Sequence, residues 1–227
     1  MNNLKLLFHT AAYGWLLLCV TTTFAQVPKK PHHTSFSNST IEKHQKSAGE
    51  RFLSDVAAEP STTNAILAQT MRDLYVQTDA HFEKGEYNHT INLNRIVAQG
   101  DPHNMDTYAD SAWLLWSTDR PTEAVTFLKQ GIAANPNTYY LYDEMGELYW
   151  LDLKEPVKAI PYYQKAVQFD CPFFTWNSLA HCYEKTGQME NAVATWKKAS
   201  RYASNVVAQI NLKRVEKSMA AHKSGKQ

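Results

Sequence analysis

Apolar residues recur every three or four positions through most of the chain after residue 60, and turn residues such as Gly85, Pro136 and Gly187 interrupt them. This spacing is typical of amphipathic helices that each bury one face. Glycine and proline end such segments, because glycine weakens a helix and the residue before a proline is biased out of the helical region. The pattern therefore predicts an all-α chain, with helices over about residues 64–83, 87–99, 105–117, 121–134, 139–152, 157–169, 173–185, 189–202 and 206–222.

Small residues recur within the predicted helices at a constant interval. Ala112, Gly146 and Ala180 are equally spaced, and a large residue such as Tyr149 follows three positions after each of them. A small residue leaves room for the backbone of a neighbouring helix, and the large residue fills the space beside it. The interval predicts repeated pairs of closely packed antiparallel helices, each of which buries its apolar face against the next pair.

The second half of the repeated unit is slightly out of phase. The step from Ala124 to Ala159 is one position longer than this interval, and the step from Ala159 to Ala192 is one position shorter. The middle unit therefore contains one additional residue, and we expect this insertion in the turn around Leu153–Glu155.

The repeated unit resembles the tetratricopeptide repeat, whose period of about 34 positions matches the interval between the small residues. It also contains a run of a small residue, an aromatic four positions later and a second small residue, as in Ala159, Tyr163 and Ala166. The resemblance implies a right-handed α-solenoid of about four helix pairs in residues 61–204, with units of about 71–104, 105–138, 139–172 and 173–204. The first unit departs most from the pattern. Residues 205–227, which are rich in lysine, are expected to form a capping helix with a frayed tail.

Residues 1–25 have the composition of a secretory signal. Lys5 precedes an apolar run centred on Ala11–Val20, and Thr23 and Ala25 occupy the small-residue positions of a cleavage site before Gln26. We therefore expect an exported protein, either periplasmic or secreted. An uncleaved membrane anchor is the alternative.

The residues that follow the signal are polar. Residues 26–60 are rich in Pro, Lys, Ser and Thr, which predicts a flexible spacer that contains at most a short helix over residues 41–58. Asn38 and Asn88 each begin an N-glycosylation sequon, for which chance occurrence is the simpler interpretation.

Charge is distributed unevenly along the chain. Without Lys5 the chain has 22 basic and 22 acidic residues, so the mature protein is neutral. Residues 71–151 nevertheless contain 12 acidic against 5 basic residues, a balance of −7, whereas residues 197–227 contain 8 basic residues against Glu216 alone, a balance of +7. The neutral chain is therefore polarised, with an acidic middle part and a basic C-terminal end.

The sequence contains no motif that would support catalysis. A phosphate-binding glycine loop, a His-Glu-x-x-His helix and a nucleophile elbow are all absent, and the histidines do not converge with the cysteines as metal ligands would. Cys171 and Cys182 are too far apart on a predicted turn and helix for a disulfide, so we expect two unpaired, mostly buried thiols. The basic residues lie at the C-terminal end and do not alternate with aromatics, which argues against nucleic-acid binding. We expect a protein without enzymatic activity, cofactor or metal.

In the tetratricopeptide family the first helix of each unit lines the inner groove of the solenoid. Carried onto this chain, the resemblance implies that the following residues, here called the predicted groove residues, bind the ligand: Tyr75, Asp79, Phe82, Asp106, Trp113, Trp116, Tyr140, Asp143, Glu147, Trp150, Phe174, Asn177 and His181. Such a groove would be aromatic and acidic. It lacks the Lys, Arg and Asn set with which some members clamp the terminal carboxylate of a peptide, which argues against a chaperone C-terminus as the ligand.

This composition favours a scaffold that binds a protein or peptide, and a basic partner would match the acidic groove. Two other functions stay open. The tryptophans could stack on a glycan or bind a small amphiphile, or the chain could be a structural module that self-assembles through its terminal caps.

Overall fold

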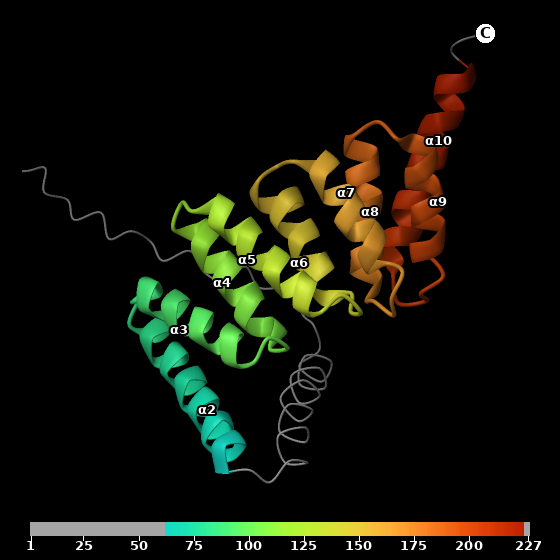
Figure 1. The fold of residues 1–227 in the computed structure, drawn as a ribbon. Helices are drawn as coiled ribbons and strands as arrows, with labels where there is room; N and C mark the ends of the chain where they lie inside the picture. Colours follow the sequence, from blue (N-terminus) through green and yellow to red (C-terminus); the bar gives the residue numbers. More distant parts are fainter. Residues whose placement is uncertain (1–61, 225–227) are drawn as a thin grey trace, which may run out of the picture. The chain divides into compact units, whose positions relative to one another are not determined.

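A computed structural model describes residues 62–224, and within this range it contains helices and turns without any strand (Figure 1). The predicted signal, the spacer and the last three residues lie outside the described range. The elements are α2 (Thr62–Glu83), α3 (Tyr87–Gly100), α4 (Met105–Ser117), α5 (Pro121–Ala134), α6 (Tyr140–Glu147), the π-helix η1 (Leu148–Asp152), α7 (Pro156–Ala166), α8 (Phe173–Lys185), α9 (Met189–Ala199) and α10 (Val206–Ser224).

The helices pack in the order of the chain. α2 packs against α3, α4 against α5, α6 and η1 against α7, and α8 against α9, while α10 packs on α9. Each pair also contacts the next one through α3 and α4, α5 and α6, and α7 and α8. The prediction of an all-α solenoid is therefore confirmed, and α2 and α10 form the two ends of the described stack.

The small residues lie where the helices of a pair touch. A Cβ atom added to Gly146 would lie 2.7 Å from Cε1 and 2.8 Å from Cδ1 of the Tyr163 ring. Ala180 and Ala159 are completely buried, and Tyr163 is 1% exposed. The predicted contact between a small residue on one helix and an aromatic ring on the next is confirmed.

Replacing Gly146 by leucine is expected to lower the free energy of unfolding by about 1–3 kcal/mol or more, because the new side chain would overlap the buried Tyr163 ring. Urea unfolding followed by circular dichroism would measure the loss. Ala80→Leu is the matched control, since Ala80 is an exposed helical residue on α2. An unchanged unfolding midpoint for Gly146→Leu would show that this glycine does not form the tight contact.

The connection between the two helices of a pair explains the change of phase in the repeat. In the second and fourth pairs the chain leaves the first helix through equivalent hydrogen bonds, from Arg120 N to Leu115 O (2.8 Å) and from Gln188 N to Tyr183 O (2.8 Å). In each bond the acceptor lies five positions before the donor. In the third pair the corresponding bond runs from Glu155 N to the carbonyl oxygen of a residue six positions earlier, Tyr149 (2.7 Å).

The additional residue is taken up by the π-helix η1. Leu153 N donates to Leu148 O over 2.9 Å, which widens the last turn by one residue before the chain reverses at Lys154 with a φ of 58°. A single π turn inside a helix is the usual way to accommodate an inserted residue. We expected the insertion in the turn at Leu153–Glu155. It lies instead about one helical turn earlier, in η1 at the end of the first helix of the pair.

Two local expectations differ from the structure. α7 ends at Ala166 and α9 at Ala199, each three positions before the predicted end, because the following residues form tight turns with bonds such as Phe169 N to Ala166 O (3.1 Å). On the capping helix Ile210 is 62% exposed, whereas Val215 is completely buried.

A polar network that centres on Glu184 of α8 connects the last three helices. Trp196 of α9 is completely buried, and its Nε1 donates to Oε1 of Glu184 on α8 over 2.7 Å. The same carboxylate accepts two bonds from Nη2 of Arg214 on α10, at 2.9 and 2.7 Å.

Cys171 and Cys182 are both buried and free. Within residues 62–224 no helix is both long and apolar enough to span a bilayer.

Candidate functional site

The predicted groove residues differ in how far they are buried. Most of them are half-buried, whereas Asp79 is exposed and Asp143 is buried. Half-burial is suited to binding, since such a side chain is held by its neighbours and still offers a surface to a ligand.

Side chains from α2, α4 and α6 meet at the N-terminal half of the stack. Tyr75 comes from α2, Asp106 from α4 and Tyr140 from α6, and Asp106 forms a side-chain hydrogen bond with Tyr140. Burial raises the pKa of Tyr75 and of Tyr140, and the negative charges of Asp106 and Asp110 raise both further. Three residues predicted from separate helices are therefore brought together.

Asp110 belongs to this group, although the sequence analysis did not select it. It lies four positions after Asp106, which places the two carboxylates on the same face of α4. That spacing was a signal that could have identified it.

Aromatic side chains adjoin these carboxylates. The Phe82 ring lies 6.3 Å from that of Trp113, and 5.8 Å from that of Tyr87. Trp113 packs against the core, and its Nε1 is a buried donor for which the described residues provide no acceptor. Buried indole donors normally have a partner. We call Tyr75, Phe82, Asp106, Asp110, Trp113 and Tyr140 the acidic–aromatic cluster.

Asp143 differs from the ligand-binding groove position that the resemblance implied. It is 8% exposed, and burial together with the charge of Glu147 raises its pKa to about 7. The reason is its position three places before Gly146, which turns it toward the packed side of α6. It faces Cys171 before α8 and Thr175 at the beginning of the next unit, and a side-chain hydrogen bond with Thr175 acts to lower its pKa.

Asn177 is also engaged within the protein. Asn177 occupies the same position in the fourth unit as Asp143 in the third, and Asp143 lies one full repeat before it. Its Nδ2 donates to Oδ1 of Asn205 over 3.3 Å, and Nδ2 of Asn205 donates back to Oδ1 of Asn177 over 2.8 Å. This reciprocal pair ties α8 to the start of α10, so the structure places Asn177 in a packing contact.

His181 packs inside the last helix pair. Its ring meets that of Trp196 edge to face at 4.8 Å, and its Nδ1 lies 3.9 Å from Glu184 Oε1. Burial lowers the pKa of His181, which favours the neutral ring. The fourth unit therefore uses two of its three predicted groove residues for contacts with α9 and α10.

The remaining predicted groove residues lie along the middle of the stack. Trp116 and Trp150 are half-buried, pack against the core and occupy equivalent positions in successive units. Glu147 raises the pKa of both Asp143 and Asp152, and burial is the larger cause in each case. Phe174 meets Phe173 edge to face at 6.0 Å.

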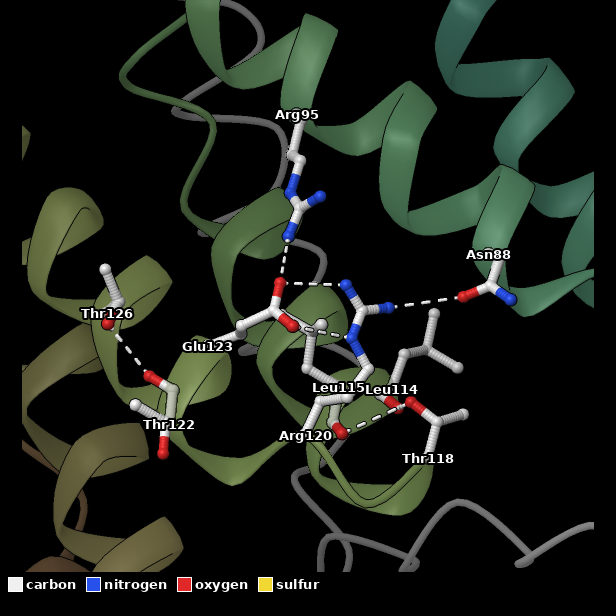
Figure 2. A network of polar contacts seen from close by, with 9 residues as sticks. All are labelled: Asn88, Arg95, Leu114, Leu115, Thr118, Arg120, Thr122, Glu123 and Thr126. Atoms are coloured by element: carbon white, nitrogen blue, oxygen red, sulfur yellow. Dashed lines mark hydrogen bonds and ion pairs between the residues drawn. The ribbon is translucent and has the colours of Figure 1, made fainter.

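Two arginines of the N-terminal half lie on or beside the second helices α3 and α5. Glu123 of α5 accepts bonds from Arg120 Nε (2.8 Å) and from Arg95 Nη2 (2.8 Å), and Arg120 Nη1 also donates to Oδ1 of Asn88 (3.2 Å), as Figure 2 shows. The two guanidinium groups lower the pKa of Glu123 to about 2. Both arginines are thus engaged away from the acidic–aromatic cluster.

A cavity of about 370 Å³ lies beside this network, between α3 and α5. Arg95 and Glu123 are at its edge, and Tyr108 and Phe127 are among its apolar walls. No predicted groove residue lines it. Among residues 62–224 no group of three potential metal ligands comes together.

The comparisons with known proteins identify one repeat directly and the fold as a whole. A family profile described as tetratricopeptide repeat matches residues 175–205. The structure is similar to that of MamA (TM-score 0.56, 18% identity, 69% of this chain and 86% of that one) and of PilW, a type IV pilus biogenesis factor (0.51, 18%, 69% and 72%). It is also similar to a Podosopora anserina putative kinesin light chain with TPR-like repeats (0.50, 15%, 69% and 90%). At these identities the likeness concerns the fold. No curated protein matches the sequence.

Proposed function

We propose that this chain, which has one matched tetratricopeptide repeat and a fold of successive helix pairs, is a non-catalytic scaffold that binds a cationic polypeptide along its first helices. The acidic–aromatic cluster is the centre of the site. Trp116, Glu147 and Trp150 extend it along the stack.

The proposal rests on one observation. It is the composition of the helices that the resemblance places along the inner groove. α4, α6 and η1 contain no Lys, Arg or His, and besides the buried Asp143 they carry the following carboxylates: Asp106, Asp110, Glu144, Glu147 and Asp152. A surface with charges of one sign attracts ligands of the opposite sign and speeds their association. The same helices contribute aromatic rings, which supply most of the binding energy at protein interfaces.

Trp113 supports an apolar contact with the ligand. Its side chain is half-buried, so one part is held by the core and another part stays accessible. A peptide provides the apolar and basic side chains that match the cluster.

Export is part of the proposal and rests on the N-terminal residues. A signal over residues 1–25, a spacer over residues 26–60 and the four units in residues 61–204 would display the scaffold outside the cytoplasm, in the periplasm or as a secreted protein. Sequencing the N-terminus of the exported chain tests this, since cleavage predicts a protein that begins at Gln26.

Two other functions compete with peptide binding. A glycan or small amphiphile could stack on Trp116 and Trp150, because flat apolar rings bind sugar faces as well as peptide side chains. A structural module would use the ends of the stack and leave the cluster empty. Binding of a lysine-rich peptide array and of an oligosaccharide array to the same preparation separates the first two.

Replacing Trp113 by alanine is expected to weaken binding of a lysine-rich, leucine-containing probe peptide by about thirtyfold or more, since an aromatic anchor contributes about 2 kcal/mol. Fluorescence anisotropy of the labelled peptide measures the affinity. Trp176→Ala is the matched control, because this half-buried tryptophan lies under Lys198 Nζ, 5.2 Å away, and outside the cluster. Melting curves of both variants are required: if Trp113→Ala loses stability in proportion to affinity, the tryptophan only supports the fold.

A further inference from the structure

The outer face of α10 is unusually apolar for the end of a helix stack. Val206, Val207 and Ile210 are 57%, 53% and 62% exposed. Lys213 and Lys217 are also exposed, and they continue from Ile210 at spacings of three and four positions, so they share its face of the helix. One exposed stripe therefore changes from apolar to basic along α10.

The inner face of the same helix is firmly attached. Ala208 and Val215 are completely buried, and Asn205 accepts a bond from Ala208 N over 3.1 Å as the helix begins. The Arg214–Glu184 ion pair adds a contact with α8 at 2.7 Å. Because these contacts hold α10 at the opposite end of the stack from α2, its outer face does not reach the acidic–aromatic cluster of its own chain.

We propose that the outer face of α10 in one copy of the protein docks on the acidic–aromatic cluster of a second copy. The inference rests on the proposed function, since it names a second copy of this chain as the cationic partner of that site. Val206, Val207 and Ile210 meet the rings of Phe82 and Trp113, and Lys213 and Lys217 meet the carboxylates.

The two surfaces are opposite in charge and similar in length. Residues 71–151 have a charge balance of −7, and residues 197–227 have a balance of +7. From Val206 to Lys217 the helix rises about 16 Å, at roughly 1.5 Å per residue. α4 packs against α6, which sets their axes about 8–10 Å apart, and Phe82 of α2 reaches Trp113 of α4 with ring centroids 6.3 Å apart. An amphipathic helix that lies in a groove is a common mode of recognition.

This contact joins different surfaces of the two copies, so it does not close by itself. A dimer still presents one free cluster and one free α10 face, and further copies add in the same direction. The expected assembly is therefore an open series whose size depends on protein concentration.

Sedimentation velocity and light scattering on the protein expressed from the full-length chain test the inference. The wild-type mass is expected to increase with concentration and to fall as salt rises, since the charge complementarity is screened. A tail variant, Ile210→Asp with Lys217→Glu, and a cluster variant, Asp110→Lys, change exposed or half-buried side chains and are each expected to be monomeric. An equimolar mixture of the two is expected to form a dimer and nothing larger, because each variant retains one of the two surfaces.

Several results would overturn the inference. They are a wild type that is monomeric at all concentrations, a tail or cluster variant that still assembles alone, and a mixture that does not form the dimer. Pairing of two α10 faces would leave the cluster variant dimeric, and a groove occupied by another segment of the same chain would leave the wild type monomeric.

Binding of the lysine-rich probe peptide to the tail variant is measured in parallel. If the tail variant binds the probe but does not pair with the cluster variant, the proposed function stands and the inference fails.

Discussion

Replacing Trp196 by alanine is expected to lower the free energy of unfolding by about 3–5 kcal/mol, the usual cost of removing a large buried ring. The ring is completely buried, and its Nε1 donates to Glu184 over 2.7 Å. The variant therefore leaves a cavity between α8 and α9, and it also loses a hydrogen bond to a carboxylate. Chemical unfolding monitored by circular dichroism measures the loss.

Two companion variants assign the loss to its cause. Trp196→Phe retains most of the ring contacts but not the bond to Glu184, so it is expected to lie between the wild type and Trp196→Ala. Trp176→Ala removes a half-buried tryptophan from the same helix pair and is expected to cost much less. Equal losses in Trp176→Ala and Trp196→Ala would contradict a special role for Trp196.

Stability is expected to decrease as the pH rises from about 4 to about 7, and the substitution Asp143→Asn is expected to remove much of this decrease. The pKa of Asp143 is about 7 in the folded protein, above the ordinary value of an aspartate. The folded state thus holds the proton more tightly than the unfolded state, so the stabilisation is complete below the unfolded pKa and is lost as the pH rises through the folded one. At about 1.4 kcal/mol per unit, the change for this buried group is at most about 4 kcal/mol.

Urea unfolding of the wild type and Asp143→Asn at pH 5 and pH 8 measures this effect. The variant is expected to be the more stable protein at pH 8 and to differ little at pH 5. Asp152, with a pKa of about 6 raised mainly by burial, contributes a smaller change of the same sign to both proteins. Asp170→Asn, at an exposed carboxylate nearby, is the matched control for the substitution itself. Parallel stability curves for wild type and Asp143→Asn would mean that Asp143 is solvated.

Most of the fold could be predicted because glycine, proline and the constant repeat interval are signals that the sequence itself displays. α4 and α5 begin and end at the predicted residues, Met105–Ser117 and Pro121–Ala134. The ends of α7 and α9 could not be predicted as well, since Phe169 and Tyr202 continue the apolar spacing after the chain has entered a tight turn. Apolar periodicity does not distinguish the last turn of a helix from such a turn.

The site could be predicted in part, and the difference again has a physical cause. Asp106 and Tyr140 come together because they occupy the same position of the repeat in successive units, and Tyr75 of α2 lies near enough for the charge of Asp106 to raise its pKa. Asp143 and Asn177 instead contact the element that follows their unit, and their partners Thr175 and Asn205 are distant in the chain. Whether a polar groove position faces solvent or the next element depends on these distant partners, which the helical pattern does not contain.

The π-helix η1 has a consequence for how such a chain can diverge. The residue added there widens the last turn of the first helix and leaves the contact between the two helices unchanged, since Gly146 before it and Tyr163 after it still meet. A gain or loss of one residue at this point is therefore close to silent for selection, whereas the same change inside α6 or α7 would rotate every later side chain of that helix by about 100°. Length variants among descendants of this gene should accumulate at the connections, where counting a fixed interval along the sequence loses its phase although the packing is kept.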